Sequence, residues 1–328
     1  MSEFYDSAAS QEQALENKLV NTALTKYPVP FLSGMKLNAD IEINGLTLNT
    51  IDENETIWVV NDIEGWWTLP EPEIPDVPRG WGDGSYDAIG RWTNRIMTLN
   101  GSFLTQTPED AATARATLMG VISPLVRSST AGYLIVNEPN PSNPGQVIRK
   151  SAKVRLSDTP EIISMNARGR HDFSIGLKAV DPVKYEFISG DPDGYDSRTL
   201  TANALGVAST SITNSGDIAV PIIIELSANF QVSNPVIGFC PRIQIGSDWI
   251  DIVDGTGQNI KLEIDTYNRE ALKVTYDGEE IDLVENGRSN LAVIVTWLYL
   301  EPGSNTVSLA RFPENSTCTI YYKSGWIG

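Results

Sequence analysis

The chain has 328 residues, 41% of them hydrophobic, and a formal net charge of −18 at neutral pH. This apolar share excludes a disordered or collagen-like chain, and so large an acidic excess argues against adhesion to nucleic acid, which needs a clustered basic surface. The length predicts about two or three domains, and because there is no apolar run of about 18 residues and no signal-like leader, neither a membrane span nor conventional secretion is expected.

The first predicted element is an amphipathic helix over residues 8–26. Ser10 and Gln13 form a capping box at its start, and apolar residues then recur every four positions. Pro28 ends it, because proline disfavours helix in the residue before it. The apolar stripe is too narrow to build a core, so this arm must lie on the body of the protein or on a neighbour.

Alternation of apolar and polar residues begins after residue 31 and predicts strands. Residues 36–43 and 46–51 form a predicted hairpin around a turn at Asn44-Gly45, and residues 56–60 form a third strand.

Residues 61–90 are predicted to be a long loop. Prolines at positions 70, 72, 75 and 78 favour extended, unpaired backbone. A loop of this length is either functional or partner-bound, and its aromatic side chains need burial against something. The expected contact residues with a neighbouring subunit or an adjoining protein are Trp66, Trp67, Arg79, Trp81 and Tyr86.

The next hundred residues predict a β-rich body with one helix. Residues 91–104 alternate as a central strand, and Thr107 then caps a helix that runs through residues 111–122 until Pro124. After a surface turn at 137–145, further strands are predicted at 146–156, 161–167 and 171–179. The run Asp191-Pro-Asp-Gly194 lacks the ligand spacing of a calcium loop, so it is expected to be a solvated turn and the linker to a second domain.

From Arg198 onward the sequence predicts short strands separated by turns. Residues 271–276 and 279–284 read as a hairpin around Asp277-Gly278. Residues 290–300 are apolar on both faces and predict a central strand, which a turn at 302–305 connects to a strand at 306–310. This spacing predicts a two-layer jelly-roll or galectin-like β-sandwich.

Few residues are available for catalysis or metal binding. His171 is the single histidine, and the two cysteines, Cys240 and Cys318, lack the spacing of a metal site. We find no nucleophile elbow, phosphate-binding loop or dinucleotide fingerprint. The expectation is a structural His171, either exposed or hydrogen-bonded, two buried thiols, and no catalytic, cofactor or metal site.

The charge changes sign along the chain. Residues 1–87 carry a net charge of −12, residues 88–190 carry +4, and residues 191–328 carry −10. Two interpretations stay open. Either an acidic face of one copy meets a basic face of the next and closes a ring, or both faces are solvated.

Motifs in both halves carry a resemblance to a known family. In the first half they are Asp76-Val-Pro-Arg-Gly-Trp-Gly-Asp-Gly-Ser-Tyr-Asp87, Gly90-Arg-Trp, Arg95 to Phe103, the Thr-Pro-Glu-Asp helix start and Leu177 to Tyr185. In the second half they are Gly216 to Pro221, Asn234-Pro235, Leu262 to Asp265, Arg269 and Trp297 to Asn305. Over about residues 31–328 the chain resembles distal tail proteins of long-tailed, siphovirus-type phages, especially minor tail proteins of actinobacteriophages.

The resemblance implies a mainly β fold in three parts. These are an N-terminal helical arm over 1–30, a tail-tube-like, ring-forming β-barrel or sandwich over 31–193, and a galectin-like sandwich over 194–328. It also implies a structural virion protein whose hexameric ring joins the tail tube to the tail tip or baseplate and lets DNA pass. The implied partners are the tail tube protein, the tape measure protein and the baseplate hub or other minor tail proteins. The implied location is the tail tip of the virion, after assembly in the host cytoplasm.

Two other classes of function stay open. A carbohydrate-binding module for host attachment would use the sandwich, with Trp249, Trp297 or Trp326 stacking on a sugar of a cell-surface glycan. A tail-associated glycan hydrolase would need two carboxylates facing each other in a cleft, which the sequence cannot place.

Overall fold

The computed structural model describes residues 41–328, except 79–84, 87–89, 128–130, 141–144, 166–168, 189, 228–239, 255–259, 278–279 and 292–296. The chain divides into two compact units, Met1–Ala39 and Asp40–Gly328. The helix expected at residues 8–26 lies outside the described residues. The second unit is mainly β.

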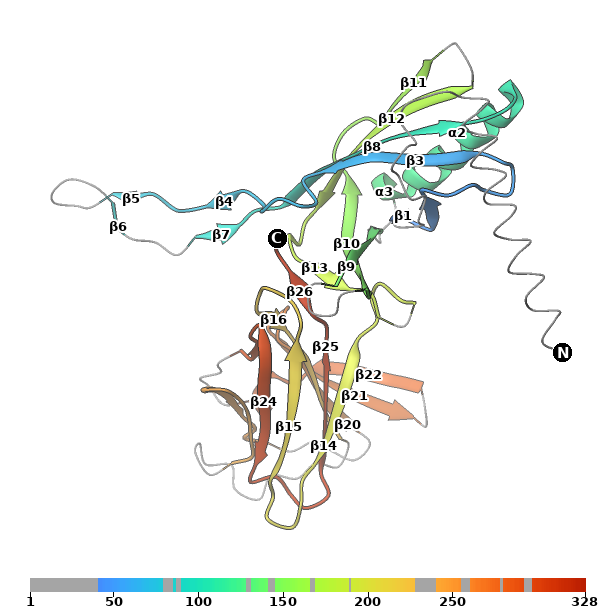
Figure 1. The fold of residues 1–328 in the computed structure, drawn as a ribbon. Coiled ribbons are helices and arrows are strands. Elements are labelled where there is room, and N and C mark those ends of the chain that lie inside the picture. The colour runs from blue at the N-terminus through green and yellow to red at the C-terminus, as the bar shows by residue number, and fades with distance from the viewer. Residues whose placement is uncertain are drawn as a thin grey trace. The chain divides into compact units, whose positions relative to one another are not determined.

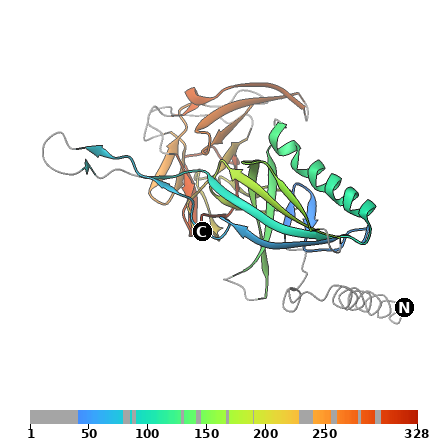
Figure 2. The same ribbon diagram turned by 90° about the horizontal axis from the view of Figure 1, so that it is seen from above.

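One hydrophobic core, the first core, lies between a curved antiparallel sheet and a helix (Figures 1 and 2). The sheet has the spatial order β2-β1-β9-β10-β12-β8-β3, with β11 paired to β12 and β13 paired to β10. Its strands are β1 Ile41–Ile43, β2 Leu46–Leu48, β3 Ile57–Glu64, β8 Arg95–Leu104, β9 Gly132–Pro139, β10 Val147–Leu156, β11 Glu161–Met165, β12 Arg170–Ala179 and β13 Lys184–Glu186. β8 lies between β12 and β3, which confirms the central strand predicted at 91–104 for residues 95–104.

Helix α2, Pro108–Ile122, covers one face of this sheet (Figure 2). A capping box fixes its start, since the Thr107 hydroxyl accepts a hydrogen bond from the Asp110 backbone N–H at 3.1 Å and the Asp110 carboxylate accepts one from the Thr107 N–H at 3.2 Å. The buried side chains Ala114, Leu118 and Ile122 pack into the first core. The helix expected here is confirmed, although Pro124 starts a further short helix, α3 Pro124–Arg127.

The hairpin predicted around Asn44-Gly45 is also confirmed. β1 pairs with β2 in antiparallel register, and both turn residues have positive φ angles, 46° and 90°. Such a turn matches the twist of the paired strands, and Asn-Gly adopts it at little cost.

β9 is a strand where no strand was predicted, and its last residues overlap the turn expected at 137–145. It lies between β1 and β10, and five of its eight residues are buried, among them the consecutive residues 134–136. A strand covered on both faces shows no clean alternation, so the period-two signal is missing from its sequence.

A second hydrophobic core lies inside a two-layer β-sandwich. One sheet has the order β14-β25-β17-β20-β21-β22 and the other β15-β24-β18-β19, while β16 pairs with β23. The bounds are β14 Asp196–Thr201, β15 Ala208–Asn214, β16 Val220–Pro221, β17 Ile223–Leu226, β18 Arg242–Ile245, β19 Asp248–Asp251, β20 Ile260–Asp265, β21 Glu270–Asp277, β22 Glu280–Asn286, β23 Tyr299–Leu300, β24 Gly303–Ala310 and β25 Thr317–Tyr322. The sandwich expected for the second half is therefore present.

The central strand expected at 290–300 is wrong at both of its described ends. Residues 288–290 form a 3₁₀ turn, and residues 299–300 form β23, which pairs only with the short β16; residues 292–296 lie outside the described part. Leu298 and Leu300 are fully buried, so the apolar run does enter the second core. A continuous apolar run reports burial, and it does not by itself specify a strand.

The hairpin predicted at 271–284 is confirmed, with a shifted turn. β21 and β22 pair, but a register irregularity after Thr275 makes Asp277 and Glu280 the closing pair, so the loop does not fall on Asp277-Gly278. The turn at Asp191-Pro-Asp-Gly194 is present too, because the Asp191 side chain accepts a hydrogen bond from the Asp193 N–H at 2.8 Å.

Both cysteines are buried free thiols, as expected, and burial raises the pKa of Cys318 to about 12. His171 differs from its expectation, since it is only 7% exposed and its ring stacks on Phe103 at 4.8 Å. Its Nδ1 atom finds no hydrogen-bond partner among the described residues. Burial, followed by the charge of Arg115, lowers the pKa of His171.

Replacing His171 by Phe should therefore change how stability depends on pH. Because the pKa of His171 is lower in the folded than in the unfolded chain, the unfolded chain binds the proton better, and the wild type loses stability as pH falls through about 6.5. The variant keeps the stack on Phe103 without a titrating group. Urea unfolding at pH 8 and pH 5 measures the free energy of unfolding of both proteins. The variant should be more stable relative to the wild type at pH 5 than at pH 8. A difference in stability that is the same at both pH values would contradict this assignment.

Candidate functional site

The segment expected to be an unpaired loop at 61–90 is instead built on paired strands. β3 continues to Glu64, and the chain then forms β4 Pro72–Glu73, β5 Val77–Pro78, β6 Ser85–Tyr86 and β7 Arg91–Trp92 before β8. β4 pairs with β7 and β5 with β6, and Figure 1 shows these strands beyond the ends of β3 and β8. We call residues 65–94 the hairpin segment.

The expectation that proline prevents pairing here is wrong. Pro72 lies opposite Trp92 and Pro78 opposite Ser85. Each pair of strands is only two residues long and is not part of a larger sheet, so a missing proline N–H breaks no continuous ladder. An ion pair between the Arg91 Nε and the Glu73 carboxylate at 2.8 Å joins β7 to β4, and it lowers the pKa of Glu73.

The five predicted contact residues lie in different environments. Trp66 is fully buried in the first core, so its side chain is not available for contact with another subunit, whereas Trp67 is 57% exposed. Tyr86 is on β6, opposite Val77. Arg79 and Trp81 lie outside the described residues. Ile74 and Leu69 are further exposed apolar residues of the same segment, which the sequence reasoning did not single out.

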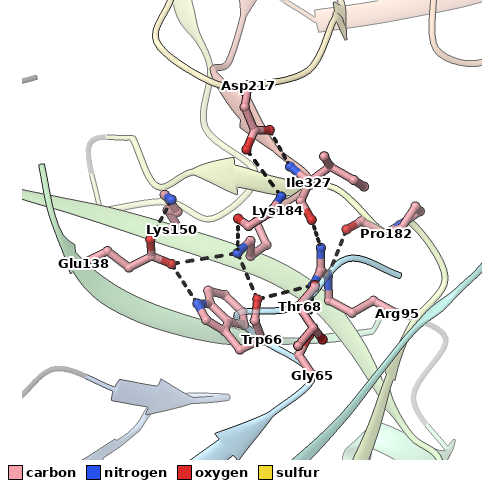
Figure 3. A network of polar contacts seen from close by, with 11 residues as sticks. Gly65, Trp66, Thr68, Arg95, Glu138, Lys150, Pro182, Lys184, Asp217 and Ile327 are labelled. Atoms are coloured by element: carbon pink, nitrogen blue, oxygen red, sulfur yellow. Dashed lines mark hydrogen bonds and ion pairs between the residues drawn. The ribbon is translucent and has the colours of Figure 1, made fainter. Parts of the chain in front are cut away.

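A buried cluster of charged residues lies at the base of the hairpin segment (Figure 3). We call it the junction cluster, and it consists of Arg95, Glu138, Lys150 and Lys184, all less than 9% exposed. One oxygen of Glu138 accepts a hydrogen bond from the Trp66 indole at 2.7 Å, and the other accepts one from the Lys150 ammonium at 2.6 Å. The Lys184 ammonium is 4.0 Å from the same carboxylate.

The other cations of the cluster bind backbone carbonyls. Arg95 donates to carbonyl oxygens of Gly65, Thr68, Pro182 and Ile327. Lys184 donates to the Trp66 carbonyl at 3.0 Å and to the Gly328 carbonyl at 2.7 Å. The cluster therefore fixes the start of the hairpin segment and the segment 325–328 to the same place on the first sheet.

Segment 325–328 is also held by strand pairing and by Asp217. β26, Gly325–Trp326, pairs with β13, and the Asp217 carboxylate accepts hydrogen bonds from the backbone N–H groups of Ile327 at 2.6 Å and Gly328 at 3.3 Å (Figure 3). Asp217 belongs to the loop between β15 and β16 of the sandwich. The junction cluster thus links the two cores at the point where the hairpin segment leaves the sheet.

Burial shifts the pKa values of two cations in the junction cluster. Burial lowers the pKa of Lys184 to about 8, and Glu138 opposes this shift. Burial also lowers the pKa of Arg95. Arg95, Lys150 and Lys184 each have a carboxylate or carbonyl partner within the chain.

Sequence reasoning missed this cluster, because its members are far apart in the chain. No role was predicted for the charges of Lys150 and Lys184 beyond the basic balance of residues 88–190. The one available signal was that each stands within or next to an alternating apolar run, where a solvated lysine is uncommon.

No group of three or more His, Cys, Asp or Glu side chains in the described part could hold a metal ion. Among the helices described, none has the length and apolar character needed to cross a membrane.

Comparisons with known proteins were made for sequence and for structure. No protein-family model matches the chain, and no curated protein sequence matches it. Among solved structures, the crystal structure of the Dit (gp 19.1) protein of phage SPP1, described as a paradigm of the hub adsorption apparatus in Gram-positive infecting phages, aligns with a TM-score of 0.55 and 14% identity. This alignment covers 87% of the present chain and 98% of the SPP1 chain.

Two structures of the phage P2 baseplate in its activated conformation also align, one with Ca and one with Sr. Their TM-scores are 0.39 and 0.41, with 9% and 10% identity, over 78% and 87% of this chain and 89% and 97% of theirs. The SPP1 alignment shows that the fold of this chain is similar to that of a phage Dit protein. It confirms, at the level of fold, the resemblance to distal tail proteins stated from the sequence.

Proposed function

We propose that this chain is a structural protein of a phage tail, forming a hexameric ring that joins the tail tube to the tail tip or baseplate and lets DNA pass. The observation that carries the proposal is the fold similarity to the SPP1 Dit protein over 98% of that chain. Because the alignment covers 87% of this chain, it includes residues of both cores. A non-enzymatic role agrees with the junction cluster, whose charged groups are all engaged in holding the chain together.

The two cores are assigned different duties. We assign residues 31–193, with the curved sheet and the hairpin segment, to ring assembly, and residues 194–328, with the sandwich, to peripheral contacts. The arm at 1–30 would contact the same assembly. The proposed partners are the tail tube, tape measure, and baseplate hub or other minor tail proteins, at the tail tip of a virion assembled in the host cytoplasm.

Charge supports a head-to-tail ring. Residues 1–87 carry a net charge of −12 and residues 88–190 a net charge of +4, so the two segments are complementary in charge. Head-to-tail interfaces between such faces generate closed rings. A net charge of −18 also suits a conduit for DNA, because a basic lumen would retain phosphate.

The proposal predicts that the purified protein forms closed rings in negative-stain micrographs, and that the hairpin segment is part of the contact. Buried Trp and Arg side chains dominate many interfaces at about 2 kcal/mol or more each, so the double variant Arg79→Ala, Trp81→Ala should lose most rings. Trp249→Ala is the matched control, since Trp249 is an exposed tryptophan of the sandwich.

Two results would contradict this arrangement. One is a monodisperse monomer both at high concentration and within intact tails. The other is hydrogen exchange over Asn61 to Gly90 that is equally fast in the free chain and in the assembled tail.

The alternative classes have less support from the described side chains. Trp326 is buried over Lys150, Trp297 packs partly against the second core, and Trp249 is exposed beside the Arg242 guanidinium, at 4.6 Å. Of the three tryptophans expected to stack on a sugar, Trp249 is thus the one most open to solvent.

For a glycan hydrolase, a pair of carboxylates stands out. Glu225 and Glu263 lie directly opposite each other on β17 and β20, and burial and Glu225 raise the pKa of Glu263. Lys261 is 3.2 Å from Glu225 and already compensates its charge. Solubilisation of host cell wall by the purified protein, abolished in Glu263→Gln, would favour this class over the structural role.

A further inference from the structure

A cavity of about 210 Å³ lies between the first sheet and the sandwich. Its walls come from β9, β10 and β13 on one side, and from β17 and the turn after β20 on the other. This volume is large enough for a small cyclic ligand.

Aromatic side chains form much of this wall. Tyr133, Tyr185, Tyr195 and Tyr267 line the cavity, together with Pro221. Tyr195 is 46% and Tyr267 57% exposed, so their rings are open to a ligand. Tyrosine rings offer apolar faces, and their hydroxyls supply a polar edge at the same place.

The carboxylates in the lining are fixed by bonds within the protein. Asp181 accepts a hydrogen bond from the Tyr185 hydroxyl at 2.9 Å. Asp265 accepts hydrogen bonds from the N–H groups of Tyr267 at 2.8 Å and Asn268 at 3.1 Å, and from the Asn268 amide at 2.7 Å. These contacts hold the turn that carries Tyr267, so this wall is formed in advance of any ligand.

The charges of the lining nearly cancel. The lining contains three carboxylates, those of Asp181, Asp193 and Asp265, and two ammonium groups, those of Lys153 and Lys323. Lys153 lies 3.8 Å from Asp193. Lys323 lies 4.4 Å from the centre of the Tyr195 ring and donates to the Pro192 carbonyl at 2.9 Å. An anionic ligand would therefore have to compete with Asp193 for Lys153, and a cationic ligand would meet the ammonium groups of Lys153 and Lys323 in the same lining.

We propose that this cavity binds one ring of a neutral pyranose sugar. The C–H face of the sugar would lie on the exposed tyrosine rings, and its hydroxyls would bond to the spare lone pairs of the fixed carboxylates and to the lysine donors. A pocket with aromatic walls and a few fixed donors and acceptors of both kinds fits an uncharged polyol. An organic cation is disfavoured, because the Lys323 ammonium already lies over the Tyr195 ring and a second ammonium, that of Lys153, lies in the same lining beside Asp193.

This inference goes beyond the ring proposal and does not depend on it. Sugar binding is measured on the purified chain whatever its oligomeric state, and ring formation is measured without sugar. Each proposal can therefore fail while the other stands.

The test is saturation-transfer NMR on the full chain with methyl α-D-glucopyranoside, methyl β-D-galactopyranoside and N-acetyl-D-glucosamine as neutral probes. Glucuronate and tetramethylammonium are the charged comparators. For probes of about 13 to 15 non-hydrogen atoms, we expect a millimolar dissociation constant for at least one neutral probe and no transfer to either comparator.

Variants tie the binding to the cavity. Tyr267→Ala and Tyr195→Ala should each weaken binding at least about fivefold, and Tyr267→Phe should keep it, because the stacking face is retained. Trp92→Ala is the matched control, since Trp92 is an exposed aromatic residue of the hairpin segment that does not line the cavity, and this variant should bind like the wild type. Absence of transfer to every neutral probe, transfer to tetramethylammonium instead, or equal losses in Trp92→Ala and Tyr267→Ala would overturn the proposal.

Discussion

Replacing Ile224 by Asp is expected to unfold the sandwich while leaving the first core protected. Ile224 is fully buried in the second core, on β17 between β25 and β20. An unpaired carboxylate there costs several kcal/mol, comparable to the roughly 5 to 15 kcal/mol that stabilise a whole domain. Hydrogen exchange should show lost protection of β17, β20 and β25 amides, with β8 and β12 amides still slow.

The control places the same charge on the surface of the same sandwich. Ser209 is exposed on β15, so Ser209→Asp should leave exchange and unfolding unchanged within about 0.5 kcal/mol. The same division of the chain predicts that the isolated segment Asp196–Gly328 folds cooperatively and forms no rings. Simultaneous loss of protection in both cores of Ile224→Asp, or an unfolded isolated segment, would contradict separate domains.

The parts of the fold that the sequence predicts well are those fixed by near neighbours in the chain. The Asn44-Gly45 hairpin and the Thr107 capping box each depend on residues within four positions, and both are present. Alternation also predicts β8, β10 and β12, because one face of each strand meets the first core.

The parts that failed depend on pairing between distant residues. Pro72 can lie in a strand because β4 meets only the two residues of β7, which no local rule reveals. The run at 290–300 is apolar because it enters the second core, and its path is set by contacts such as the Val253 N–H bond to the Asn290 carbonyl at 2.8 Å. At the described ends of this run, hydrophobicity predicted burial correctly, whereas the long central strand is replaced there by a 3₁₀ turn and the short β23.

The candidate site shows the same limit. The aromatic side chains of residues 61–90 were expected to be buried against a partner. In the fold, adjacent residues differ: Trp66 lies inside the first core and Trp67 is exposed. The junction cluster could not be predicted, since Arg95, Glu138 and Lys184 meet only through the order of β8, β9, β10 and β13 in the sheet. The role of Arg79 and Trp81 stays a prediction.

Removing the carboxylate of the junction cluster should have the second large effect. Glu138→Ala leaves Lys150 and Lys184 buried beside each other without their counterion, which typically costs about 3–5 kcal/mol. Urea unfolding at pH 7 measures this loss of unfolding free energy. Glu42→Ala is the matched control, because Glu42 pairs with Arg149 on the same sheet with both side chains partly exposed, and this loss should stay within about 1 kcal/mol.

The pH dependence separates a charge effect from lost packing. The pKa of Lys184 is lowered to about 8 in the fold, so the unfolded chain binds this proton better and stability rises with pH between about 8 and the ordinary lysine value of 10.5. Glu138 opposes that lowering, so without it the pKa of Lys184 falls further and the rise begins at lower pH. The loss of unfolding free energy in Glu138→Ala relative to the wild type should therefore become smaller between pH 7 and pH 9.

Adding Lys150→Met to Glu138→Ala should restore part of the stability at pH 7. A loss of stability that is constant between pH 7 and pH 9 and unaffected by Lys150→Met would mean that Glu138 acts through its contact with the Trp66 indole, and that the buried cations need no counterion.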